Sequence, residues 1–121
     1  MYRIKNKNIY LNRGDQLTVN LVNKKDSFKI GDTLEFYVCA QGDYTNVVFQ
    51  KHFDIDENTQ TFGMDFTSEE MRIGNPIKGD PKIYWYEIEL NGRLTLVGYD
   101  NNGPKLFVLY PEAIGSGGGS I

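Results

Sequence analysis

The sequence contains few of the residues on which covalent or metal chemistry depends. It has one cysteine and one histidine in 121 residues. Cys39 has no partner for an internal disulfide, and its position inside an apolar segment predicts a buried, unreactive thiol. His52 has no second His or Cys nearby at metal-ligand spacing, so we expect an exposed side chain and no zinc site. A serine nucleophile elbow and a phosphate-binding glycine loop are also missing. We therefore expect no enzyme, no metal and no cofactor.

Long apolar runs and an excess of basic residues are missing as well. The longest apolar run, residues 106–110, is far shorter than the roughly 20 residues that cross a bilayer as a helix. Residues 1–8 lack the apolar stretch of a signal peptide. The net charge of −3 gives no basic face for nucleic acid. The tightest basic cluster, Arg3 with Lys5 and Lys7, is expected to be a solvated strand edge. We expect a soluble domain, made in the cytoplasm, with neither a membrane nor a nucleic acid as partner.

What the sequence does contain is a repeated turn signal. Four Gly-Asp pairs each precede a segment rich in β-branched and aromatic residues. Glycine supplies the positive φ of a tight turn, and aspartate bonds nearby backbone. Alternation of apolar and polar residues after these turns predicts half-buried strands, and therefore an all-β antiparallel β-sandwich of about seven or eight strands. The strands are expected at residues 9–11, 16–22, 33–40, 46–53, 61–66, 82–90, 95–99 and 105–110.

Three connections carry further predictions. Asn91-Gly92 lies between two strand segments and predicts a hairpin with a type I′ turn. Residues 68–73 predict one short helical crossover, because Thr67 or Ser68 can cap it and glutamates occupy its first turn. The Gly/Ser-rich composition of residues 114–121 indicates a linker or an appended tail that follows a domain of residues 1–113.

The strand pattern also assigns faces. Phe36, Val38, Tyr86, Ile88 and Leu96 are predicted to be core. A second set is predicted to project from the opposite faces, where it either completes the packing or forms an exposed patch for a partner. This candidate interface consists of Tyr37, Trp85, Val97, Phe107 and Leu109.

Two motifs have a functional and a structural interpretation. Arg13-Gly14-Asp15 is the tripeptide that integrins bind, but a β-turn before a strand is the favoured interpretation. The acidic stretch 54–58 is similar to the start of a calcium loop. An EF-hand loop needs glycine at its sixth position and glutamate at its twelfth. Those positions hold Thr59 and Asp65, so an acidic hairpin loop is favoured.

The order of these features resembles one family, the N-terminal immunoglobulin-like domains of phage upper baseplate proteins and tail-fibre adaptors. The resemblance spans residues 9–113 and includes a longer connection at residues 72–82 than relatives usually have. The matching segments are Arg13–Leu17, Phe36–Val38, Val47–Lys51, Phe66–Met71, Tyr84–Ile88 and the closing hairpin of residues 94–110.

The resemblance implies a non-enzymatic structural protein of the virion, made in the host bacterial cytoplasm. It would attach a tail-fibre or baseplate protein to the tail, contact other virion proteins, and form a homo-oligomer, such as a trimer, in the full-length protein. The alternative is a carbohydrate-binding module that stacks exposed Trp85 and tyrosines on sugar rings. Aromatic side chains that line a groove beside polar groups favour the second function, and a flat aromatic patch favours the first.

Overall fold

The computed structural model describes residues 2–112, and this part of the chain is all β-structure with no helix. The predicted linker at 114–121 lies outside the described residues. All eight predicted strands are present within a few residues of their expected bounds. The strands are β1 (Tyr2–Lys5), β2 (Asn8–Asn12), β3 (Leu17–Val22), β4 (Thr33–Ala40), β5 (Asp43–Asp54), β6 (Thr61–Phe66), β7 (Lys82–Leu90), β8 (Leu94–Val97) and β9 (Lys105–Tyr110).

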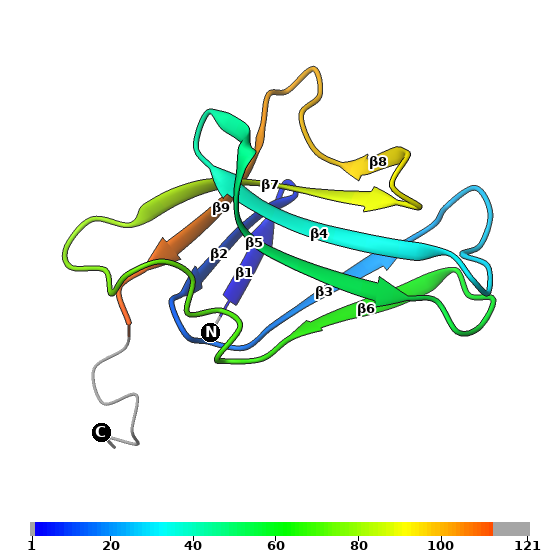
Figure 1. The fold of residues 1–121 in the computed structure, drawn as a ribbon, viewed down its shortest axis with the longest axis horizontal. Helices are drawn as coiled ribbons and strands as arrows, with labels where there is room; N and C mark the ends of the chain where they lie inside the picture. Colours follow the sequence, from blue (N-terminus) through cyan, green and yellow to red (C-terminus); the bar gives the residue numbers. More distant parts are fainter. Residues whose placement is uncertain (1, 113–121) are drawn as a thin grey trace.

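The strands form two sheets of unequal size (Figure 1). The large sheet has the order β1-β2-β9-β7-β4-β5, with β8 beside the second half of β7. The small sheet pairs β3 with β6. Strands β2 and β9 run parallel, with Ile9 opposite Phe107. The expectation of purely antiparallel sheets is therefore wrong, and the large sheet is mixed. Sequence alternation sets which face a residue occupies, but it does not set the direction of the neighbouring strand.

The core lies between the small sheet and one face of the large sheet, which we call the inner face. Phe36 is fully buried near the centre of the core, with ring centroids 4.7 Å from Phe66 of the small sheet and 5.3 Å from Tyr86. Val38 and Ile88 are also buried, which confirms their prediction as core. Leu96 is only partly buried and packs at the margin.

Two predicted turns are confirmed by their backbone geometry. The N–H of Asp15 donates to the carbonyl of Asn12, closing the turn around Arg13-Gly14. Asn91 and Gly92 both have positive φ, 56° and 65°, as the two central residues of a type I′ turn require. The N–H of Arg93 donates to the carbonyl of Leu90 and closes this turn at 3.1 Å.

The predicted helix at 68–73 is absent, and a single turn replaces it. Thr67 and Glu70 form the predicted capping box: each side chain accepts a hydrogen bond from the backbone N–H of the other. The turn ends because the carbonyls of residues 71–74 bond to other partners. The N–H of Gly14 donates to the carbonyl of Met71, and the guanidinium of Arg13 donates to the carbonyls of residues 72, 73 and 74.

The sequence analysis missed one strand, β1. Tyr2 and Ile4 alternate with Arg3 and Lys5, but the strand has only four residues and all of them are exposed, so its alternation marks no buried face. It pairs with β2 at the margin of the large sheet, and the Asn6-Lys7 turn joins the two strands. The basic cluster of Arg3, Lys5 and Lys7 lies on this strand and its turn, which confirms its prediction as a solvated strand edge.

Candidate functional site

The most distinctive surface of the domain is the face of the large sheet that points away from the small sheet, which we call the outer face. The pairing register of β4 with β7 shows which residues lie on the outer face. Trp85, Glu87 and Glu89 alternate with buried Tyr84, Tyr86 and Ile88 along β7. On β4 they stand opposite Cys39, Tyr37 and Glu35 respectively. The outer face therefore carries aromatic side chains and carboxylates side by side.

Two tyrosines lie beside Trp85, one from the start of β5 and one from the β8–β9 loop. The ring centroid of Tyr44, from the start of β5, lies 5.3 Å from that of Trp85. The ring centroid of Tyr99, from the β8–β9 loop, lies 6.2 Å away. Figure 1 shows the β4–β5 turn and the β8–β9 loop above β7 on the same side. We call Tyr44, Trp85 and Tyr99 the aromatic trio.

The members of the aromatic trio differ in how far they are exposed to solvent. The hydroxyl oxygen of Tyr44 is buried and has no hydrogen-bond partner within residues 2–112. Burial raises the pKa of Tyr44, and the charge of Glu87 raises it further. Tyr99, in contrast, is 64% exposed. A buried hydroxyl without a partner is unfavourable, and Tyr99 is the member of the trio that is most open to solvent.

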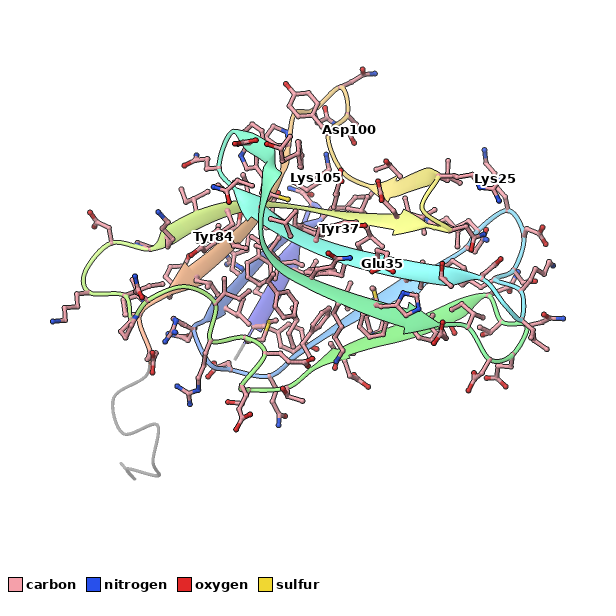
Figure 2. The ribbon with its side chains drawn as sticks, viewed as in Figure 1. Lys25, Glu35, Tyr37, Tyr84, Asp100 and Lys105 are labelled. Atoms are coloured by element: carbon pink, nitrogen blue, oxygen red, sulfur yellow. The ribbon has the colours of Figure 1, made fainter. Side chains whose placement is uncertain are left out.

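Three half-buried carboxylates lie next to the aromatic trio around Tyr37, and we call them the acidic cluster: Glu35, Glu87 and Glu89. Figure 2 shows Glu35 and Tyr37 along β4. Glu35 is paired with His52 of β5. Within the described part of the chain, neither Glu87 nor Glu89 forms a salt bridge.

Two groups at the acidic cluster have a raised pKa, the carboxyl of Glu87 and the hydroxyl of Tyr37. Burial raises the pKa of Glu87, and the neighbouring charge of Glu89 raises it further. Burial also raises the pKa of the Tyr37 hydroxyl, followed by the charges of Glu89, Glu35 and Glu87. Tyr37 is hydrogen-bonded to Glu89, but neither Glu87 nor Glu89 forms a salt bridge within residues 2–112, so a cation placed here would relieve the repulsion between these two carboxylates.

The five residues of the predicted interface do not form one surface. Tyr37 and Trp85 lie together on the outer face, each partly exposed. Val97 packs against the margin of the core from β8. Phe107 and Leu109 are fully buried on the inner face, so their assignment to an interface is wrong. Apolar residues run almost without interruption through β9, and such a run contains no alternation from which a face can be assigned.

Two residues of the trio were missed by the sequence analysis. Tyr44 lies before the expected start of its strand, and Tyr99 lies at the expected end of another. No periodic pattern extends to such positions. The register between β4 and β5 shifts near Cys39, next to the pairing of Ala40 with Asp43, and such a bulge is not visible in residue types alone.

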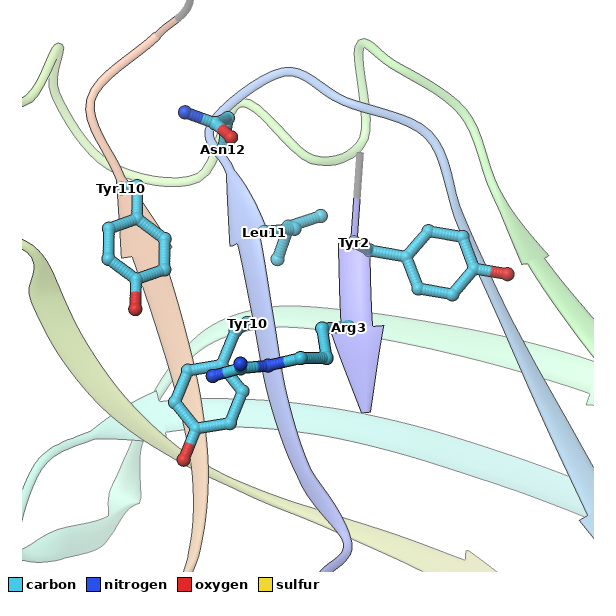
Figure 3. A pocket seen from close by; sticks show the side chains of 6 residues that line it. All are labelled: Tyr2, Arg3, Tyr10, Leu11, Asn12 and Tyr110. Carbon is cyan, nitrogen blue, oxygen red and sulfur yellow. The ribbon is translucent and has the colours of Figure 1, made fainter. Parts of the chain in front are cut away.

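A second surface feature is a groove of about 300 Å³ at the margin of the large sheet, lined by Tyr2, Arg3, Tyr10, Leu11, Asn12 and Tyr110. We call it the tyrosine groove. The guanidinium of Arg3 lies 4.9 Å from the ring centroid of Tyr10. In Figure 3, Tyr10 and Tyr110 lie on neighbouring strands beside Arg3, and the ring of Tyr2 points away from them. The groove thus places aromatic rings beside polar groups.

The remaining sequence motifs have structural roles. Arg13 is buried and bonded to backbone carbonyls, so it is not available to an integrin. Residues 55–60 connect β5 of the large sheet to β6 of the small sheet, so the expected acidic hairpin is a crossover between sheets. His52 is half-exposed, as predicted.

Residues 2–112 contain no group of three or more His, Cys, Asp or Glu side chains arranged to hold a metal ion.

None of the described residues belongs to a helix long and apolar enough to cross a membrane. Comparisons of the chain with models of protein families, with curated proteins and with solved structures found no match.

Proposed function

We propose that this domain is a non-enzymatic structural module of a phage virion, with an immunoglobulin-like β-sandwich fold. It attaches a tail-fibre or baseplate protein to the tail through contacts with other virion proteins. The observation that supports an attachment role most directly is the outer face, where the aromatic trio and Tyr37 lie apart from the inner-face core. Tyrosine and tryptophan are enriched at protein interfaces. The virion setting rests on the sequence resemblance.

Two structural features fit this proposal. Two sheets that pack through one apolar core agree with a sandwich, the fold that the resemblance implies. Strand β1 pairs on one side only and stands at the margin of the large sheet. Such an edge offers backbone groups to a strand from another protein or another copy.

The proposal is tested by locating the protein in assembled particles. We expect mass spectrometry of purified virions from the phage that carries this gene to detect its peptides at a fixed ratio to tail proteins. Light scattering on the full-length protein is expected to give the mass of a homo-oligomer, such as a trimer. Peptides absent from purified virions but abundant in the lysate would overturn the proposal.

A second candidate function, carbohydrate binding, is favoured by the tyrosine groove. Tyr10 and Tyr110 offer ring faces, and Arg3 and Asn12 offer polar groups at the same groove. A glycan array with the wild-type protein and with Tyr110→Ala distinguishes the candidates. Saturable binding of a defined glycan that Tyr110→Ala abolishes, together with a monomeric full-length protein, would favour carbohydrate binding over attachment.

A further inference from the structure

The outer face contains two independent features that select the same kind of ligand. The first is the pair of half-buried carboxylates, Glu87 and Glu89, with no Lys or Arg partner within residues 2–112. The second is the aromatic trio beside them, whose ring faces attract cations. Glu87 and Trp85 are two residues apart on one face of β7, so both features lie within reach of one side chain.

Other charges on the outer face do not occupy this position. His52 lies between Glu35 and Asp54, at the β5 side of the acidic cluster. Arg3 stacks on Tyr10 at the opposite margin of the sheet. The hydroxyl of Tyr44 is buried and is not available to a ligand on this face. The position next to Glu87 therefore has carboxylates and aromatic rings, and no Lys or Arg of residues 2–112 forms a salt bridge there.

We propose that the outer face binds an extended segment of a partner protein through a Lys or Arg side chain seated between Trp85 and Glu87. This inference rests on the proposed attachment function and specifies the chemistry of the partner. A cation at this position forms charge-assisted hydrogen bonds with the carboxylates and stacks on the trio. The aliphatic stem of the Lys or Arg covers the exposed part of the rings.

Trp85 is the only tryptophan of the chain, so its fluorescence reports binding at this position directly. The probe is the capped peptide Gly-Lys-Gly-Lys-Gly, titrated into the full chain, with Gly-Glu-Gly-Glu-Gly as its matched control. We expect the lysine peptide to change the Trp85 emission saturably with a dissociation constant on the order of 1 mM, and the glutamate peptide to leave it unchanged. The affinity is expected to fall as salt rises.

Variants separate this position from the general negative charge of the domain. Glu87→Gln with Glu89→Gln is expected to weaken the lysine peptide about tenfold or more, since it removes both carboxylates and keeps their shape. Tyr99→Ala is a second variant that leaves the core intact, because Tyr99 is 64% exposed, and it is expected to weaken the peptide as well. Asp56→Asn with Glu57→Gln changes the net charge equally in an exposed loop and is the matched control.

Equal weakening by the control pair, or equal binding of both peptides, would overturn the inference. Such a result leaves the proposed attachment function standing if the protein is found in virions. If the protein is absent from virions but binds the lysine peptide selectively, the attachment function is overturned and the inferred site stands. The site would then serve a partner outside the particle.

Discussion

The side chain of Arg13 donates a 2.9 Å hydrogen bond from Nε to the backbone carbonyl of Ile73, which is 60 residues away in sequence. Its Nη2 atom donates to the carbonyls of Arg72 and Gly74, and its Nη1 atom pairs with Glu112. One buried guanidinium therefore joins the β2–β3 turn, the β6–β7 connection and the segment after β9.

Replacing Arg13 with Ala is expected to destabilise the fold by about 3–5 kcal/mol, because the buried carbonyls and Glu112 lose their donor together. Chemical denaturation of both proteins measures the difference. The matched control is Arg72→Ala, whose exposed guanidinium pairs with the same Glu112 at 3.1 Å. That variant is expected to lose no more than about 1 kcal/mol. Equal losses would mean that Glu112, and not the carbonyls, gives Arg13 its importance.

The β6–β7 connection depends on a glycine at position 74. Gly74 has φ of 70°, and a Cβ added there would lie 2.7 Å from the hydroxyl of Tyr84. Gly92 has nearly the same φ, 65°, with nothing within 4 Å of an added Cβ. We expect Gly92→Ala to destabilise the domain by about 1–2 kcal/mol, from backbone strain alone. Gly74→Ala is expected to lose more, and thermal denaturation of the two variants isolates the clash with Tyr84.

Phe36 tests the assignment of the inner face. Its side chain is fully buried between Phe66 and Tyr86, so Phe36→Ala is expected to destabilise the domain by about 3–5 kcal/mol. Ile30→Ala is the control, because Ile30 is 68% exposed, and its loss should stay within about 0.5 kcal/mol. If urea denaturation shows that Phe36→Ala lowers the free energy of unfolding by less than about 1 kcal/mol, Phe36 is not packed in the core between the two sheets.

Cys39 lies beneath the outer face and is expected to be unreactive in the native protein. Burial, followed by the charges of Glu87 and Asp43, raises the pKa of its thiol to about 11. The thiolate is the reactive form, so a thiol reagent at a pH of about 8 should modify the native protein slowly and the unfolded protein fully. Lys25→Cys places a second thiol in an exposed loop and should react at once, which checks the reagent. Rapid modification of wild-type Cys39 would show that this region opens.

Most residues of the inner face can be predicted from the sequence, because apolar residues recur at every second position of the strands and every second side chain is buried. Leu34, Phe36 and Val38 alternate with polar or smaller residues on β4, and all three are buried. The same reasoning fails on β9, where Phe107, Val108 and Leu109 are consecutive and all buried. It also fails on β1, where nothing is buried. On β9 apolar residues continue across the two faces, so the period of two is lost, whereas on β1 Tyr2 and Ile4 alternate with basic residues but neither face is buried.

The candidate site was only partly predictable for a related reason. Tyr37 and Trp85 occupy strand positions, so alternation places them opposite the core. Tyr44 and Tyr99 reach Trp85 from a bulged strand start and from a loop, where long-range packing and not local pattern sets the direction of the side chain. That no Lys or Arg in the described part of the chain pairs with Glu87 depends on how distant strands pair, which no local motif encodes.

His52 is expected to make stability fall as the pH rises above the usual histidine pKa. Hydrogen bonds to Glu35 and then to Asp54 raise the pKa of the imidazole above its usual value. A raised pKa in the folded state means that the native protein holds the proton more tightly than the unfolded chain does. The stabilisation is therefore fully present below the unfolded histidine pKa of about 6.5, and it is lost as the pH rises through the raised native value.

The stability difference between wild type and His52→Gln should accordingly be largest at a pH of about 5.5 and shrink towards a pH of about 9. Urea denaturation of both proteins across this range measures it. Because His52 is the only histidine, its ring signals can be followed by NMR without assignment, and Glu35→Gln should move its pKa back towards the usual value. A His52 titration that is the same in wild type and Glu35→Gln would show that Asp54 alone raises the pKa. A stability difference that grows with pH would contradict the expected sign, because it requires a histidine pKa that folding lowers.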